Sequence, residues 1–480
     1  MAPKIAEDFQ KRFRLFGQTN TAAQEDLMNQ LKNNTKYSGK ISLDHKDGFY
    51  QTGETAICRV TLLKGRKPIK GEKARMTLRW NGYLVETRDF ETTGKPVEFV
   101  CEGKQPGWAY FGFEVLDSNG NPLSGPGVYK HHMKPTIVTE IGAMFDPEKI
   151  VSSVIIPEDF DEFWENRRAE VRDILPLHPE IKELDSRTPG VKLFSVTIPG
   201  PRGLHASGYL AYPETAEPKS LKAGLFFQSL TYTDALRPQA LNMAKNGLLG
   251  FSASWHGFPT AQSLKYYPEV IKPYFQHGFK GLENRETWVY SDMFFRVMCE
   301  MEFVKSLPQW NGRDLIVSGG SLGGIQSIFA AAIDPQVTLA IIAVPSSCEC
   351  NAFEAGRTPN GVFRRIPLEE LKCHPEYLES GLYYDSVCFA KWIRCESYVC
   401  TGFTDESCHP GNVYAFYNAI PSGTKKHMST NPLTGHYGTT SDPCADAKIR
   451  ELFSFVKVSN HPIDWDHAKF QRESSSIHNK

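Results

Sequence analysis

Long apolar runs and an excess of charge of either sign are both missing from this 480-residue sequence. The longest apolar stretches, such as Leu339–Val344, are far shorter than the roughly 20 residues that a membrane-spanning helix needs. The chain holds 54 Lys and Arg against 55 Asp and Glu, which gives a net charge of −1. Nucleic acids and anionic membranes attract strongly basic surfaces, so we expect neither as a partner.

The first residues lack the apolar core of a signal peptide, because Met1–Phe9 is mostly polar. We therefore expect a cytoplasmic protein by default, and a periplasmic or extracellular one if a signal has been removed. The eleven cysteines include no Cys-x-x-Cys pair, and His131-His132 has no further ligands at a suitable spacing. We expect no metal and no other cofactor, with most cysteines as core thiols and a disulfide or two left open.

The length exceeds what one hydrophobic core usually covers, so two domains are expected. Asn81-Gly82 separates Met76–Trp80 from Tyr83–Val85 and predicts a hairpin with a type I′ turn. Short alternating segments of this kind predict an immunoglobulin-like β-sandwich. The predicted organisation is a helical segment (1–37), the sandwich (38–138), a linker (139–156), an α/β domain (157–473) and a disordered tail (474–480). The sandwich has two interpretations, a carbohydrate-binding or lid module and, favoured, a spacer or oligomer contact.

Apolar strands alternate with helices in the second domain, which favours a largely parallel sheet covered on both faces. The predicted helices include Pro238–Lys245 and a long one from about Tyr290 to Leu307. Reactive groups in such sheets gather at the carboxyl ends of the strands. The predicted strands are Val191–Ile198, Leu204–Ala211, Ala223–Phe227, Gly247–Ala253, Asp314–Val317, Leu339–Val344 and Glu396–Thr401.

The segment Ser318–Gly324 (SGGSLGG) lies between one of these strands and a small-residue helix. Gly319, Ser321 and Gly323 match the Gly-x-Ser-x-Gly nucleophile elbow of α/β-hydrolases. A serine on such a sharp turn needs small neighbours and projects its hydroxyl out of the sheet. The motif alone also occurs by chance, so the flanking strand and helix carry the prediction that Ser321 is a nucleophile.

A serine nucleophile needs a histidine base and an acid that orients the base, in the chain order Ser, acid, His. Asp405 is the predicted acid because it follows a strand, with Glu406 as its rival and a helix cap as the structural alternative. His436, in a Gly-flanked loop, is the predicted base, whereas His409 is too close to the acid. The backbone N–H groups of Leu322 and of Leu230 or its neighbour, after the third main strand, are predicted to form the oxyanion hole.

Together these residues resemble the acetyl xylan esterase and cephalosporin C deacetylase family, the carbohydrate esterases of family 7. The resemblance implies an α/β-hydrolase fold, a Ser321–Asp405–His436 triad and, in short members, a hexameric assembly. It spans roughly Pro157–Val456 and rests on several segments in one order. These segments are Pro157–Trp164, Trp288–Met293, Ser318–Gly324, Ala343–Cys348, Gly402–Pro410, Val413–Asn418 and Gly435-His436.

The sequence departs from the family pattern at four places around the predicted site. Ser254–Gly257 stands at the family's Arg-Gly-Gln stretch, and Gln228-Ser229 at the usual His-Gly. Leu322 replaces the glutamine after the serine, and Tyr437 replaces the glutamate after the histidine. The oxyanion donors are backbone N–H groups, so these side-chain substitutions leave them in place. The same substitutions alter the wall of the substrate pocket. Trp255, His256 and Tyr437 are therefore the candidate substrate-binding residues.

The sequence thus predicts a serine esterase that removes acetyl or another small acyl group from a carbohydrate, such as acetylated xylo-oligosaccharide. A serine peptidase or general carboxylesterase on the same scaffold is the first alternative. A catalytically decayed hydrolase that binds glycan is the alternative from another class. A homo-oligomer is left open.

Overall fold

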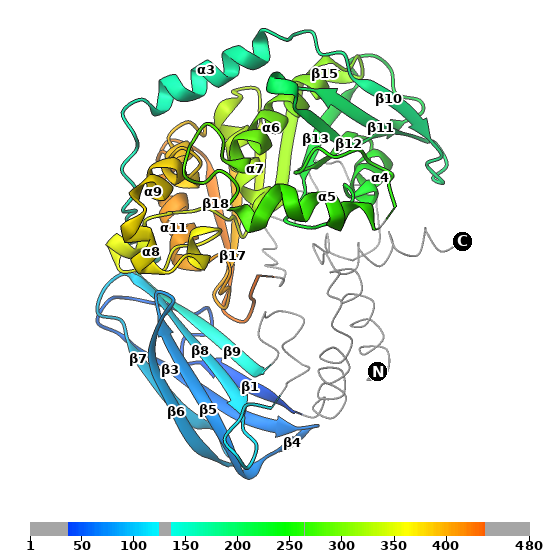
Figure 1. The fold of residues 1–480 in the computed structure, drawn as a ribbon. Helices are drawn as coiled ribbons and strands as arrows, with labels where there is room; N and C mark the ends of the chain where they lie inside the picture. Colours follow the sequence, from blue (N-terminus) through cyan, green and yellow to red (C-terminus); the bar gives the residue numbers. More distant parts are fainter. Residues whose placement is uncertain (1–36, 124–135, 264, 437–480) are drawn as a thin grey trace.

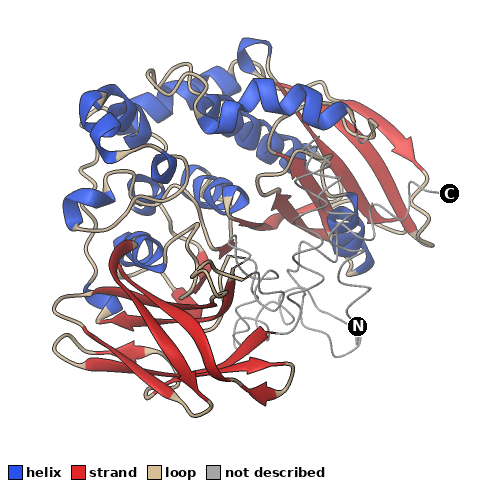
Figure 2. Cartoon of the chain, turned by 60° about the horizontal axis from the view of Figure 1, so that its bottom comes forward, coloured by secondary structure: helices blue, strands red, loops and turns tan. Residues whose placement is uncertain are grey.

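The computed structural model describes residues 37–123, 136–263 and 265–436. The predictions made for residues 1–36, His131, His132, Tyr437 and the 474–480 tail lie outside these ranges. The described chain forms two parts, an amino-terminal pair of β-sheets and a larger α/β part (Figure 1). Figure 2 shows that strands and turns build the first part, while the helices belong to the second.

The two amino-terminal sheets enclose one hydrophobic core, to which both contribute alternate side chains such as Cys58, Phe99, Phe111 and Phe113. The first sheet contains β1 (Tyr37–Leu43), β3 (Thr55–Lys64), β4 (Lys67–Pro68) and β7 (Val97–Glu102). The second has the order β2 (Phe49–Tyr50), β9 (Ile137–Phe145), β8 (Gly107–Val115), β5 (Lys70–Trp80) and β6 (Tyr83–Thr93).

The predicted Asn-Gly hairpin is confirmed. Asn81 and Gly82 have φ angles of 51° and 87°, and Trp80 pairs with Tyr83. Both central residues of a type I′ turn need positive φ, which Asn and Gly tolerate best. The predicted sandwich boundary at residue 138 falls inside β9, because this strand continues to Phe145 and pairs with β8 along its length.

A nine-stranded mixed sheet forms the centre of the α/β part. Its six strands β14, β13, β15, β16, β17 and β18 are parallel, while β10, β11 and β12 pair antiparallel at one edge. In sheet order the strands are β10 (Glu180–Leu184), β11 (Val191–Pro199), β12 (His205–Pro213), β14 (Leu249–Ser254), β13 (Leu221–Phe227), β15 (Trp310–Gly320), β16 (Leu339–Ala343), β17 (Glu396–Gly402) and β18 (Lys426–Asn431).

Helices cover both faces of this sheet. Val191 and Leu193 of β11 pack with α4, while Val196 and Ile198 point to the opposite face and join the core that contains α6 and α7. The α-helices are α3 (Phe160–Arg172), α4 (Arg237–Lys245), α5 (Tyr266–Phe275), α6 (Val289–Ser306), α7 (Leu322–Ile333), α8 (Leu368–Cys373), α9 (Pro375–Leu382), α10 (Ser386–Ala390) and α11 (Pro410–Ala419). Short 3-10 helices are η1 (Pro147–Lys149), η2 (Pro201–Gly203), η3 (Gln276–Gly278), η4 (Ala352–Ala355) and η5 (Phe363–Arg365).

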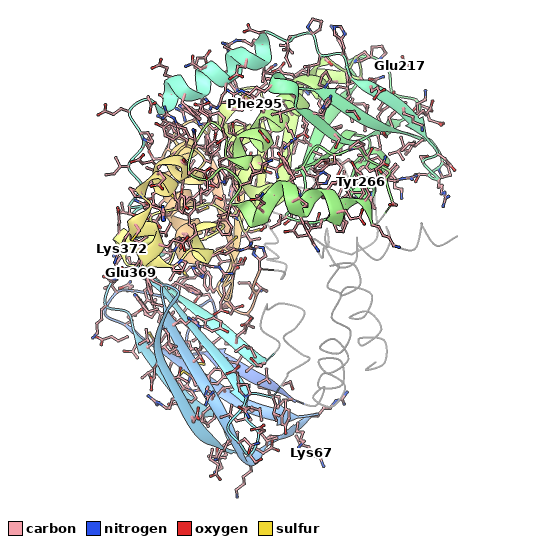
Figure 3. The ribbon with its side chains drawn as sticks, viewed as in Figure 1. Lys67, Glu217, Tyr266, Phe295, Glu369 and Lys372 are labelled. Carbon is pink, nitrogen blue, oxygen red and sulfur yellow. The ribbon has the colours of Figure 1, made fainter. Side chains whose placement is uncertain are left out.

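The two parts meet through a small hydrophobic cluster. Trp108 and Met144 of the second amino-terminal sheet pack there with Phe403 and Tyr414 of the α/β part. In Figure 3, Glu369 and Lys372 on α8 lie near this junction, and Lys67 on β4 lies at the far end of the sheets. The described ranges contain no helix suited by length and apolarity to crossing a bilayer. The ten cysteines within them are free thiols, so none forms a disulfide.

Candidate active site

Ser321 lies at the sharp junction between β15 and α7. Its φ and ψ are 55° and −116°, a conformation that costs a residue with a side chain of order 1–3 kcal/mol. Hydrogen bonds tie the turn to β16 and the loop after it: the Ser321 N–H donates to Ala343 O at 2.9 Å, and the Ser346 N–H donates to Ser321 O at 3.1 Å. The strained turn that the sequence motif predicts is therefore present, and β16 and the loop after it fix it.

The two motif glycines are needed because other backbone passes against them. A Cβ atom on Gly319 would lie 2.4 Å from the carbonyl oxygen of Gly323. One on Gly323 would lie 2.1 Å from the carbonyl oxygen of Phe227, at the end of β13. Contacts this short do not occur with real side chains, so the elbow and the segment after β13 approach more closely than any other residue would allow.

The imidazole of His436 connects Ser321 to Asp405. Its Nε2 lies 3.0 Å from Ser321 Oγ, and its Nδ1 lies 2.9 Å from Asp405 Oδ2. The other oxygen, Asp405 Oδ1, accepts the backbone N–H groups of Ser407 at 2.7 Å and Cys408 at 2.8 Å. The carboxylate is 1% exposed and is turned by these donors so that Oδ2 faces the imidazole. The structure thus brings the three residues together in hydrogen-bonding geometry.

The environment of His436 changes its pKa in a defined direction. Burial alone lowers the pKa of the imidazole, but the neighbouring Asp405 charge and Cys408 more than offset this and raise it well above 6.5. Burial raises the pKa of the Cys408 thiol. A carboxylate beside the imidazole stabilises its protonated form, which is the form a general base reaches after it has taken a proton.

The rival residues are engaged elsewhere. Glu406 forms an ion pair with Arg79 of β5, with Nε and Oε1 3.1 Å apart. His409 is buried, and its Nδ1 lies 2.7 Å from Thr358 Oγ1. Burial lowers the pKa of His409 to about 4, so this ring is neutral at pH 7. Neither residue takes the place of Asp405 or His436 beside Ser321.

The segments that carry the two predicted oxyanion donors lie side by side. Leu322 is the first residue of α7, so its N–H precedes the hydrogen bonds within the helix. Leu230 follows β13 in the segment that passes against Gly323. The side chain of Gln326 bridges them, because its Nε2 donates to Gln228 O at 3.2 Å and to Leu322 O at 3.0 Å.

Trp255 and His256 support the segment after β13 from within the protein. Trp255 Nε1 donates to Thr231 O at 3.1 Å, and His256 Nε2 lies 3.1 Å from Thr233 O. Both side chains are only 1% exposed, and burial lowers the pKa of His256 to about 3. Their polar atoms thus hold backbone carbonyls, and a role for them in substrate binding stays a prediction. Tyr437, the third candidate, lies outside the described residues.

Within the described part of the chain, one group of three side chains lies close enough together to hold a metal ion. These are Asp405, Cys408 and His436, whose possible ligand atoms lie within 4.8 Å of one another. Asp405 and His436 already bind each other, so the arrangement is accounted for by their hydrogen bond. Sequence reasoning missed Gln326 and Arg79, because a glutamine within a helix and an arginine in a distant strand carry no local signal of a role at this site.

The chain matches a known protein family. The family model for acetyl xylan esterase (AXE1) matches residues 148–442. The acetyl esterase Axe7A of Xylanibacter ruminicola is 26% identical over 415 residues, which cover 83% of this chain and 86% of that protein. Less than a fifth of this chain lies outside that alignment, whereas the segment before residue 148 makes up more than a quarter of the chain. The alignment therefore includes part of that segment.

Solved structures with the same fold include two acetyl xylan esterases. That of Paenibacillus sp. R4 has a TM-score of 0.53 and 19% identity, and covers 64% of this chain and 98% of its own. Acetyl xylan esterase 1 of Thermoanaerobacterium sp. JW/SL YS485 has a TM-score of 0.53 and 20% identity, and covers 64% and 97%. At these identities the likeness shows a mixed α/β fold of the α/β-hydrolase kind. With more than half of its residues matched by the family model, the chain belongs to the acetyl xylan esterase family and is a carboxylic ester hydrolase.

Proposed function

We propose that the chain is a serine esterase that removes acetyl or another small acyl group from a carbohydrate, such as an acetylated xylo-oligosaccharide. The observation that carries the proposal is the continuous hydrogen-bonded path from Ser321 Oγ through His436 to Asp405. It occurs on a strained elbow at the carboxyl end of a parallel strand, where α/β proteins gather reactive groups. Membership of the acetyl xylan esterase family supports acetyl as the group that is removed and a carbohydrate as the substrate.

His436 begins the reaction as a general base. Its neutral Nε2 accepts the Ser321 hydroxyl proton while Oγ attacks the ester carbonyl carbon, and the carbonyl oxygen becomes an oxyanion. Asp405 keeps the Nδ1–H directed at its own Oδ2, so that Nε2 is the free nitrogen. His436 then gives the proton to the departing sugar oxygen, which leaves Ser321 carrying the acyl group.

The backbone N–H groups of Leu322 and Leu230 stabilise the oxyanion in both halves of the reaction. Donors that are fixed before the reaction need no reorganisation as charge develops, and one such donor is worth about 10²–10³ in kcat. Gln326 fixes these donors by bridging the two segments. Water, deprotonated by His436, then attacks the acyl carbon. The bond to Ser321 Oγ breaks, Oγ takes the proton back from His436, and the carboxylic acid leaves.

A panel of esters tests this function and separates it from its alternatives. Acetylated xylo-oligosaccharides, longer-chain p-nitrophenyl esters and a dipeptide p-nitroanilide are offered to the wild type and to Ser321→Ala. Release of acetate from the oligosaccharides at the highest kcat/KM, lost in Ser321→Ala, supports the proposal. A higher kcat/KM on the long-chain ester or on the amide identifies a general carboxylesterase or a peptidase. Glycan binding without any turnover identifies a decayed hydrolase.

A further inference from the structure

The amino-terminal sheets contact the loop that carries Asp405, both before and after that residue in the sequence. Trp108 of β8 donates its indole N–H to the carbonyl oxygen of Phe403, two residues before Asp405, at 2.6 Å. Arg79 of β5 pairs with Glu406, one residue after it, at 3.1 Å. The indole and the carbonyl are both buried, so the bond between them is shielded from competing water.

The Asn81–Gly82 turn extends this contact to His409. Asn81 O accepts the Thr358 N–H at 2.9 Å, and the Oγ1 of Thr358 lies 2.7 Å from the ring of His409. A Cβ atom on Gly82 would lie 1.9 Å from Thr358 Oγ1 and 2.9 Å from His409 Cε1. The His409 ring also packs against Trp108, with ring centroids 5.1 Å apart. The turn fits here only because residue 82 has no side chain.

A third contact reaches the segment that leads to His436. The Gly142 N–H of β9 donates to Pro432 O at 2.9 Å, and a Cβ atom on Gly142 would lie 2.1 Å from Phe403 O. The two catalytic loops are also bonded to each other, since the Thr404 N–H donates to Thr434 O at 3.0 Å. The sheets therefore hold the loop of Asp405 and the approach to His436 as one unit.

We propose that the amino-terminal sheets are a positioning element of the active site, in which Trp108, Arg79 and the Asn81–Gly82 turn set the position of Asp405 relative to His436. The proposal rests on the function proposed above. None of these residues touches the reacting atoms, so each acts through the Asp405 loop. A misplacement of about 1 Å at a catalytic group can lower the rate on the order of a hundredfold. Contacts that fix the Asp405 loop therefore affect the rate of the reaction.

The comparisons accord with this role. The Axe7A alignment extends into the segment that forms these sheets. The two solved acetyl xylan esterases are covered almost completely by only 64% of this chain. The positioning role is thus assigned to chains that carry the additional sheets, and it replaces the favoured sequence interpretation of the sandwich as a spacer or oligomer contact.

A pair of glycine variants separates positioning from backbone strain. Gly82 has a φ of 87° and Gly120 a φ of 82°, so alanine strains both turns alike, yet a Cβ on Gly120 would meet nothing within 4 Å. Gly82→Ala is expected to lower kcat on p-nitrophenyl acetate by about ten- to a hundredfold with KM changed less than threefold, because the clash displaces Thr358 and His409. Gly120→Ala is expected to retain wild-type kcat.

A second pair removes a hydrogen bond without adding bulk. Trp108→Phe leaves Phe403 O without its indole donor, whereas Trp310→Phe removes an indole donor from Asp314 O at the amino end of β15, opposite the end that leads to Ser321. The pH at which kcat/KM is half-maximal is measured for all four variants, together with Tm. A looser Asp405 stabilises the His436 imidazolium less, so the midpoint falls in Gly82→Ala and Trp108→Phe and stays unchanged in the two controls.

Loss of kcat together with the lower midpoint in Gly82→Ala and Trp108→Phe alone supports positioning. Wild-type kcat in both, or lower kcat with an unchanged midpoint, overturns it. Ser321→Ala, measured in parallel, distinguishes the two proposals. Full activity in that variant refutes the proposed mechanism, whereas its inactivity beside an active, unshifted Trp108→Phe refutes only the positioning role.

Discussion

The side chain of Gln326 donates a hydrogen bond to the main-chain carbonyl of Gln228 at 3.2 Å, which links α7 to the segment after β13. The same Nε2 also donates to Leu322 O. These two segments carry the proposed oxyanion donors. The buried carboxamide thus joins two segments that the close approach of Gly323 to Phe227 already brings together.

Gln326→Met is expected to lower kcat by about tenfold or more while KM changes little. The two segments keep their N–H donors but lose the Gln326 hydrogen bond that joins them. Steady-state kinetics on p-nitrophenyl acetate measures both constants. The matched control is Gln336→Met, which alters an exposed glutamine just after the same helix. Equal kcat in wild type and Gln326→Met contradicts the bracing role.

The pH dependence of kcat/KM follows from the charge beside His436. The general base is active only when neutral, and its pKa lies above 6.5 because the Asp405 charge outweighs burial. Activity is therefore expected to rise as the pH increases through a single midpoint above 6.5. Asp405→Asn removes the charge, so the midpoint should fall and the remaining rate should be lower by about 10⁴-fold, as for other triads that lose this carboxylate. A wild-type midpoint below 6.5 contradicts this reading of the site.

Arg357 and Glu349 form a buried ion pair, with side chains 6% and 0% exposed. Arg357→Met leaves the Glu349 charge buried and unpaired, which is expected to destabilise the protein by about 3–5 kcal/mol. The control Arg75→Met breaks the exposed pair with Asp89 and is expected to cost about 0–1 kcal/mol. Urea unfolding measures both values, and equal losses of stability would show that burial does not set the cost here.

The strands of the parallel sheet could be predicted because their apolar runs are continuous. The prediction for β17 ends one residue before Gly402. That for β15 covered only Asp314–Val317 of Trp310–Gly320, because Asn311-Gly312 resembles a turn. β10 was missed, since Glu180–Leu184 is an edge strand with mostly exposed side chains. The short helices α8 to α10 were missed because none is long enough to show a clear period.

The chain order of Ser321, Asp405 and His436 could be predicted because catalytic residues follow the strands in a fixed sequence. The supporting contacts could not. Trp108 and Phe403 are 295 residues apart, and nothing near either one indicates the other. The contacts of Trp255 and His256 could not be predicted for a related reason, because only the fold shows that their polar atoms hold the carbonyls of Thr231 and Thr233.

The central claim is that Ser321 carries the acyl group, and rapid mixing with excess p-nitrophenyl acetate tests it most directly. The account predicts a burst of p-nitrophenol equal to the enzyme concentration, an intact-protein mass increased by one acetyl group, and loss of both in Ser321→Ala. A burst and an added acetyl group of undiminished size in Ser321→Ala would contradict the account.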